Sequence, residues 1–304
     1  MSETISSVDR NAEKDVTRLS QWRLLSVLFK TRVVGLLLLA AIGGAFLAEN
    51  GVPDWQNLVI LLVAGGLSAS GSGALNEYIE KDSDALMSRT RLRPLVVGTI
   101  EHPGWVPYVS VLMIAVPCLV MLQSNRPMAF FLFLGAFIYV GIYTFWLKSR
   151  TILNIVVGGA AGSAAVLSGS AAIGVWNDPG ALVMAALLFS WTPMHFWSLA
   201  IVCRDDYMMS DIPMLPVYLS IRQSGYWIML HTIITGLAAL SLGVIPILGW
   251  FYFVPVLVMT LILVIQNTRL ILYPSVSKAR KLFHTSNIYL AVIILLICIN
   301  ISLA

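Results

Sequence analysis

Long apolar segments separated by short polar breaks run through almost the whole chain, and they limit its fold more than any other feature. A helix that crosses a bilayer needs about 20 apolar residues, and helices satisfy their own backbone polar groups in hydrocarbon. Charged residues make up only 11% of the chain, too few to cover a water-facing surface. The sequence therefore predicts an all-α polytopic membrane protein. We expect nine helices, at about residues 33–48, 58–80, 105–123, 128–147, 152–173, 180–202, 225–247, 251–273 and 285–303.

The lysines and arginines indicate how these helices are oriented. Of the 19 basic residues, only Arg126 falls in a loop on one side, and all others lie on the opposite side. Basic residues in short loops stay cytoplasmic, so we expect the N-terminus inside and the C-terminus outside the cytoplasmic membrane. Residues 1–32 then form a cytoplasmic tail, and residues 33–304 form one intramembrane domain. The net charge of +4 reflects this topological bias and does not call for a nucleic-acid partner.

Acidic residues gather in the cytoplasmic loop after the second expected helix. Asn76, Glu80 and Asp84 follow one another at intervals of four residues, which places them on one helix face over roughly 12 Å. We expect Glu77 and Asp82 to point elsewhere and to be solvated. Mg²⁺ is bound in proteins by one or two carboxylates together with substrate phosphates and water. The row therefore has the chemistry of a magnesium site.

Two further groups of charges complete the outline of a diphosphate site. Arg89 and Arg93 follow the row, and arginine makes charge-assisted bonds to phosphate. Asp205 and Asp206 lie in the loop after the sixth expected helix, on the same side of the membrane. A ring of helices would bring both acidic loops to a central pocket that opens to the cytoplasm. The alternative is that these charges only mark where helices leave the membrane.

The segment from Asn76 to Leu95, with Met87-x-Arg89-Thr90 inside it, resembles the first signature of the UbiA-type intramembrane prenyltransferases. The Met-x-Arg-Thr extension is similar to the heme O synthase branch of that family. Four other stretches, one before this segment and three after it, resemble the same branch and occur in the same order as in that branch. The similarity therefore runs from about residue 22 to 220. The four stretches are Lys30–Val34, Tyr143–Gly159, Trp191–Ala200 and Arg204–Pro216.

The resemblance implies Mg²⁺-dependent transfer of a farnesyl group from farnesyl diphosphate to the vinyl group of heme B, with release of diphosphate. Beyond the lipid bilayer, it also implies a heme A synthase or terminal oxidase assembly factors as partners. For this reaction we assign five residues to magnesium binding: Asn76, Glu80, Asp84, Asp205 and Asp206. The same five residues, together with Lys148, are assigned to catalysis. We assign to the substrates the residues Arg89, Arg93, Tyr143, Arg150, Asn154, His195 and Tyr207. For His195, the expected contact is the heme iron or a propionate.

Two departures from the family pattern leave the prenyl acceptor open. The run Gly162–Gly169 stands where the family has a Pro-Pro stretch, and Met194 stands where a proline is expected before His195. A quinone ring or a chlorin is the alternative acceptor, and a secondary transporter is the alternative from another functional class. Plainer interpretations also exist for individual residues. Lys148 and Arg150 would be topological anchors, and Asp205 and Asp206 would be helix-end caps. His195 would be a hydrogen-bonded histidine inside the bundle, and His231, which lies in an apolar run without a motif, would have a structural role.

Overall fold

The computed structural model describes residues 21–304, so most of the expected tail of residues 1–32 lies outside the described residues. Within that range, nine helices or helix pairs are long and apolar enough to cross a membrane, which confirms the predicted all-α fold with nine spans. The single-helix spans are α3 (Thr31–Glu49), α4 (Trp55–Ile79), α6 (Trp105–Ser124), α10 (Pro179–Val202), α13 (Ile221–Leu242), α14 (Gly249–Leu272) and α15 (Val276–Leu303).

The fourth and fifth spans each consist of two helical segments. The fourth joins α7 (Arg126–Ala136) to the π-helix η1 (Phe137–Leu147), and the fifth joins α8 (Asn154–Gly158) to α9 (Ala160–Ala172). Neither break was expected from the sequence, which predicts one continuous helix in each place. The short helices outside the spans are α2 (Gln21–Leu28), α5 (Lys81–Ala85), α11 (Arg204–Met209) and α12 (Leu215–Tyr218).

Two spans begin earlier than the apolar segments predict, because capping side chains set their N-termini. At α13, Ser220 and Gln223 form a reciprocal capping box, so the helix starts at Ile221 instead of about residue 225. At α15, the Ser275 hydroxyl accepts a hydrogen bond from the backbone N–H of Lys278, and the helix starts at Val276 instead of about residue 285. The first turns of α15 carry three basic residues, so these turns do not belong to the apolar segment from which the helix was predicted.

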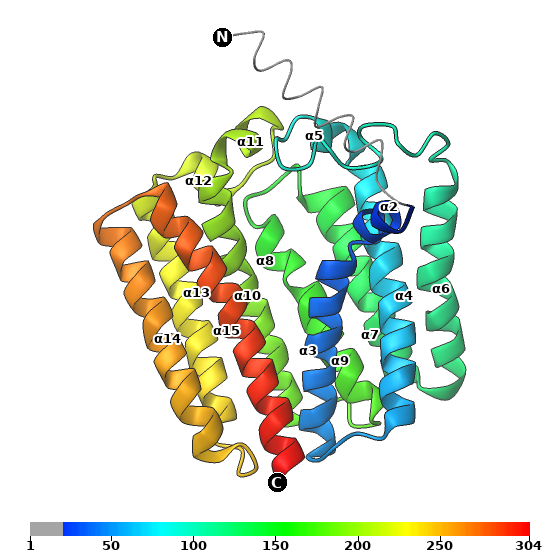
Figure 1. The fold of residues 1–304 in the computed structure, drawn as a ribbon, viewed down its shortest axis with the longest axis vertical. Coiled ribbons are helices and arrows are strands. Elements are labelled where there is room, and N and C mark those ends of the chain that lie inside the picture. The colour runs from blue at the N-terminus through cyan, green and yellow to red at the C-terminus, as the bar shows by residue number, and fades with distance from the viewer. Residues whose placement is uncertain (1–20) are drawn as a thin grey trace.

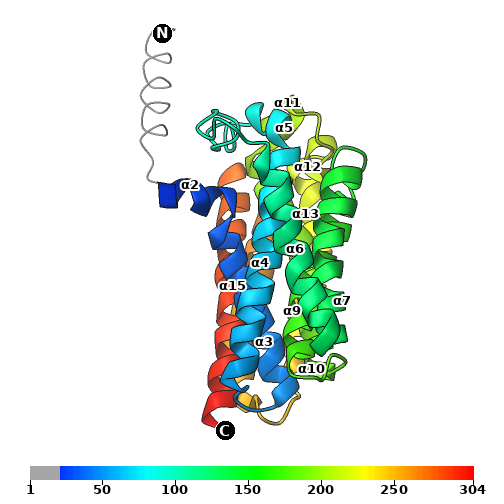
Figure 2. The same cartoon turned by 90° about the vertical axis from the view of Figure 1, so that its right-hand side faces the viewer.

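The spans run side by side and form two groups (Figure 1). In one group α10 packs against α13 and α15, and in the other α3 packs against α9 while α4 packs against α6. α5, α11 and α12 gather at one end of the bundle, and the C-terminus lies at the opposite end. α2 runs across the spans rather than along them (Figure 2). The two acidic loops predicted from the sequence therefore lie at the same end.

The run Gly162–Gly169 forms part of the contact between α9 and α3. A Cβ atom on Gly169 would lie 1.8 Å from the backbone oxygen of Ala41, and one on Gly44 would lie 2.2 Å from the backbone oxygen of Val166. Such distances exclude any side chain larger than hydrogen. Small residues allow helix backbones to approach each other closely in membranes. The C-terminal half of the run, from Val166 to Gly169, therefore has a packing role.

Candidate active site

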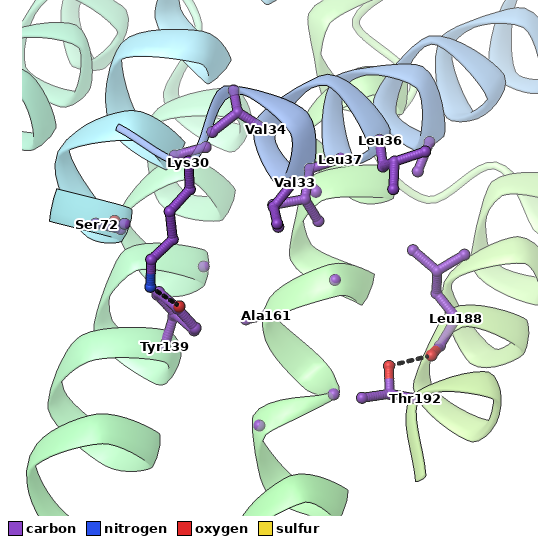
Figure 3. Close-up of a pocket in the computed structure, with 18 of the residues that line it drawn as sticks. Lys30, Val33, Val34, Leu36, Leu37, Ser72, Tyr139, Ala161, Leu188 and Thr192 are labelled. Atoms are coloured by element: carbon purple, nitrogen blue, oxygen red, sulfur yellow. Dashed lines mark hydrogen bonds between the residues drawn. The ribbon is translucent and has the colours of Figure 1, made fainter. Parts of the chain in front are cut away.

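A cavity of about 420 Å³ lies between the spans and connects a polar end to an apolar one. Its apolar wall is formed by small and aliphatic residues of α3, α4, α9, α10 and α15. Val33 and Leu36 line this wall and are also 53% and 52% exposed, so the cavity reaches the lipid-facing surface beside α3. Figure 3 shows the Lys30 side chain extending from the start of α3 towards Tyr139, at the polar end.

The row of Asn76, Glu80 and Asp84 lies at the polar end, and all three residues line the cavity. α4 ends at Ile79, but the backbone bonding at four-residue intervals continues from Glu80 N to Asn76 O (2.9 Å) and from Asp84 N to Glu80 O (2.8 Å). The three side chains therefore stay on one face, as their spacing predicts. All three residues are buried, with exposed fractions of 2%, 7% and 2% respectively.

Each member of the row contacts a cation from a different segment of the chain. Lys148, just after η1, lies 2.5 Å from a Glu80 carboxylate oxygen. Arg93 forms an ion pair with Asp84. The Lys30 ammonium donates a hydrogen bond to the side-chain oxygen of Asn76. Buried charges are stable only when they are paired, so Lys148 and Arg93 are what allows the carboxylates of Glu80 and Asp84 to lie at this depth.

Lys30 was not predicted as a site residue, because its position before the first apolar segment marked it only as a topological charge. Its backbone is left-handed, with φ of 50°, and it forms the turn between α2 and α3. This turn sends the side chain inward, where it packs on Gly73 and also bonds the Tyr139 hydroxyl at 3.2 Å. Burial, with a smaller contribution from the charge of Arg93, lowers the pKa of Lys30 to about 8.

The π-helical geometry of η1 places two tyrosines on the cavity wall. The rings of Tyr139 and Tyr143 stack with 5.9 Å between their centroids, and the Lys148 ammonium lies 5.9 Å from the Tyr143 centroid. Thr144 donates a hydrogen bond to the backbone oxygen of Tyr139 (2.8 Å) and accepts one from the Asn76 amide (2.8 Å). Short π-helical segments are often found at functional sites, and here the segment joins the fourth span to the acidic row.

The second acidic loop touches the first through Asp206. The Asp206 carboxylate accepts hydrogen bonds from the backbone N–H of Ser88 (3.1 Å) and from its hydroxyl (2.8 Å). Asp205 is exposed, and neither aspartate lines the cavity. The next residue, Tyr207, does line it, and burial raises the pKa of its phenol. The structure therefore brings the two loops together, with Asp206 bonded to the first loop.

The remaining predicted site residues divide into two groups. Arg89 and His195 line the cavity. Arg150 is exposed and bonds the backbone oxygen of Trp146 (3.3 Å), outside the cavity wall. Asn154 is fully buried and donates to the backbone oxygens of Lys148, Thr151 and Pro213, so it ties the start of α8 to the segment after α11.

The expectation that Glu77 is solvated was wrong. Its exposed fraction is 0%, and neither carboxylate oxygen has a hydrogen-bond partner among the described residues. Glu77 lies near the end of α4, a helix that packs against several neighbouring spans. The positive charges of Arg93 and Lys30 attract the Glu77 carboxylate electrostatically. Asp82, by contrast, is exposed as predicted.

The polar end fits a magnesium ion that is bound together with a phosphate-bearing substrate. No group of three or more His, Cys, Asp or Glu side chains in residues 21–304 is arranged to hold a metal by itself. Mg²⁺ does not need such a cage, because it is usually held by one or two carboxylates and substrate phosphates. One oxygen of Glu80, a residue that lines the cavity, is buried and has no hydrogen-bond partner within the described part of the chain, which leaves it available to a cation.

The sequence profile of the UbiA prenyltransferase family matches residues 36–291. The chain belongs to the UbiA prenyltransferase family. It is 42% identical over 212 residues to protoheme IX farnesyltransferase 2 of Paramagnetospirillum magneticum, covering 69% of this chain and 74% of that protein. It is 36% identical to protoheme IX farnesyltransferase of Metallosphaera sedula, covering 90% of this chain and 94% of the relative. The predicted assignment to this branch of the family is confirmed, and the transporter alternative is rejected.

Solved structures share the fold at low sequence identity. A digeranylgeranylglyceryl phosphate synthase has a TM-score of 0.78 at 13% identity, covering 94% of this chain and all of its own. The apo structure of a UbiA homolog from Aeropyrum pernix K1 has a TM-score of 0.72 at 16% identity, covering 88% and 98%. A UbiA homolog from Archaeoglobus fulgidus, bound to GPP and Mg²⁺, has a TM-score of 0.59 at 13% identity, covering 90% and 99%.

Proposed function

We propose that this chain transfers a farnesyl group from farnesyl diphosphate to a vinyl group of heme B, and that the polar end of the cavity binds the diphosphate with Mg²⁺. The observation that carries the proposal is the row of Asn76, Glu80 and Asp84 at the mouth of an apolar cavity inside a membrane bundle. Diphosphate requires cations and metal-binding oxygens, and a prenyl chain requires an apolar wall. The names of the relatives and the GPP-bound homolog support the same reading.

The residues around the row would stabilise the leaving diphosphate. Glu80 and Asp84 would hold Mg²⁺ on the phosphate oxygens, and the metal would supply Lewis-acid stabilisation of negative charge. Lys148, Arg93 and Lys30 already contact the side chains of the row. Each cation would therefore also reach a diphosphate oxygen that binds next to its partner in the row. Preorganised cations of this kind are the main source of stabilisation for developing charge.

The allylic C–O bond breaks, and its electron pair leaves with the diphosphate. Tyr139 and Tyr143 line the cavity beside the polar end, where their rings would stabilise the farnesyl cation. The π-electrons of the vinyl group then form the new C–C bond. Water adds to the resulting cation beside the porphyrin and loses a proton, which gives the hydroxyethylfarnesyl substituent.

The acceptor is tested by competition. Purified protein is incubated with farnesyl diphosphate and Mg²⁺ in the presence of heme B, a quinone-ring acceptor and a chlorin, and products are identified by mass. The proposal predicts a farnesylated, hydrated porphyrin as the main product. Farnesylation of the quinone or the chlorin in preference to heme B would reject the acceptor while keeping the prenyl transfer.

We also propose that the end carrying α5 and α11 faces the cytoplasm, since the basic residues of the described chain other than Arg126 gather there. Asp82 and Val244 are exposed at opposite ends of the bundle. In intact cells, a membrane-impermeant thiol reagent should label Val244→Cys but not Asp82→Cys. The reverse pattern would reject this orientation.

A further inference from the structure

His195 is held in one orientation by contacts between α10 and α15. Its ring lies between Trp191 and Phe283, with centroid distances of 4.3 Å and 4.5 Å and nearly parallel planes. Its Nδ1 atom lies 2.8 Å from the Ser286 hydroxyl. The Trp191 ring nitrogen donates to the backbone oxygen of the same serine (2.9 Å). The imidazole is therefore fixed on both faces and at one nitrogen.

The Ser286 hydroxyl determines which nitrogen of His195 carries the proton. Its own proton is used in a hydrogen bond to the backbone oxygen of Phe283, at 2.7 Å. A serine has only one hydroxyl proton; with that proton on the Phe283 oxygen, the hydroxyl oxygen accepts from His195 and Nδ1 is the protonated nitrogen. A neutral imidazole then has an unprotonated Nε2 with a free electron pair.

Nε2 faces the cavity. His195 is 7% exposed and lines the cavity wall, and its side-chain hydrogen bond within residues 21–304 is made through Nδ1, so Nε2 is not used. His231 provides the contrast within the same bundle. It does not line the cavity, its Nδ1 atom is enclosed without a hydrogen-bond partner among the residues that the structure describes, and its ring packs edge-to-face on Trp197. His231 is therefore a packing residue, as the plainer reading of the sequence predicts.

We infer that Ser286 sets the tautomer of His195 and that Nε2 binds the iron of the tetrapyrrole acceptor, an inference that rests on the proposed function. Metal-binding histidines usually donate their other N–H to a neighbouring acceptor, which fixes the ring and makes it a better ligand. Ser286 supplies that acceptor. His195 lies seven residues before the end of α10, about 10 Å deeper than the end of the span. Iron bound there places the macrocycle below the diphosphate end, so that its edge faces the allylic carbon.

The iron bond can be separated from the packing role of His195 by one substitution. In His195→Asn, the amide still donates to Ser286, but the ligand nitrogen is lost. His231→Asn is the matched control. The probes are heme B and metal-free protoporphyrin IX, titrated into detergent-purified protein without farnesyl diphosphate. We expect His195→Asn to weaken heme B binding by at least about tenfold, to lose the iron–histidine stretching band of ferrous heme, and to bind metal-free porphyrin as the wild type does.

Ser286 is tested as a positioning residue. Ser286→Ala should shift the iron–histidine band and weaken heme B binding by about tenfold, and Ser286→Thr should restore both. Ser198→Ala is the control, because its hydroxyl bonds only the backbone of its own helix (Met194 O, 2.7 Å). An unchanged band in Ser286→Ala would overturn the role of Ser286.

The inference and the proposed function fail in different ways. A wild-type protein that farnesylates heme B but shows no iron–histidine band would overturn the inference alone, and so would equal heme binding by His195→Asn. A wild-type protein that does not bind heme B and farnesylates another acceptor would overturn the proposed function as well.

Discussion

Lys148 and Glu80 form an ion pair across the polar end of the cavity, with 2.5 Å between the ammonium nitrogen and the nearer carboxylate oxygen. Lys148 directly follows the fourth span and Glu80 directly follows the second, and both side chains are largely buried. The pair neutralises the centre of the acidic row, whose outer members contact Lys30 and Arg93. The row is therefore balanced by cations that can also bind phosphate oxygens.

The pair predicts different effects for two neighbouring basic residues. Lys148→Gln leaves the Glu80 charge buried without its partner and removes a phosphate contact, so kcat/KM should fall on the order of 100-fold. Arg150→Gln is the matched control, because Arg150 is exposed and bonds only a backbone oxygen. Its activity should stay within about threefold of the wild type, since exposed charges contribute little. Steady-state kinetics checks both, at equal levels of membrane-inserted protein. Equal losses in the two variants would place Arg150 in the site.

The Ser88–Asp206 contact predicts energetic coupling between the two acidic loops. Asp206→Ala removes both hydrogen bonds between the loops, and Ser88→Ala removes the one that its hydroxyl donates. Because the two variants share that bond, their effects on the KM for farnesyl diphosphate should be non-additive by at least about 0.5 kcal/mol. A double-mutant cycle measures this coupling. Asp205→Ala should have the smaller effect, because Asp205 is exposed and does not contact Ser88. Strictly additive losses would show that the loops act independently.

The crossing of α3 and α9 predicts a stability effect at Gly169. A methyl group there would overlap the backbone oxygen of Ala41, and only separation of the two helices relieves the overlap. Gly169→Ala should therefore cost at least about 1–3 kcal/mol and lower the thermal unfolding temperature in detergent. Gly66→Ala is the control, since its nearest neighbour is the Leu38 side chain at 3.7 Å. A Gly169→Ala protein as stable as the control would contradict this packing.

The span count and the acidic row could be predicted because both depend on local periodicity. Apolar length determines which segments cross the membrane, and an interval of four residues determines which side chains share a face. The burial of Glu77 could not be predicted, because it depends on which neighbours cover α4 at that depth. Lys30 was missed for a similar reason: its inward direction follows from a left-handed turn between α2 and α3, which no local signal marks.

The π-helix explains a further difference between expectation and structure. Lys148 and Arg150 are two residues apart and look equivalent in the sequence. η1 ends with a hydrogen bond from Lys148 N to Tyr143 O, five residues back, which changes the direction of the side chains that follow. Lys148 consequently faces the cavity, and Arg150 faces outward. The contact of Asp206 with Ser88 was equally hidden, since it joins residues 118 positions apart.

The central claim is that Glu80 and Asp84 bind magnesium on the diphosphate of the prenyl donor. Its most direct test is the affinity for farnesyl diphosphate, measured by calorimetry with Mg²⁺ and with a chelator, in the wild type, Glu80→Gln, Asp84→Asn and the control Asp82→Asn. Asp82 belongs to the same cluster but is exposed. We expect the wild type and Asp82→Asn to bind at least about tenfold more tightly with Mg²⁺, and both cavity variants to lose this dependence. Wild-type binding that is equally tight without Mg²⁺, or cavity variants that keep the full magnesium effect, would contradict the claim.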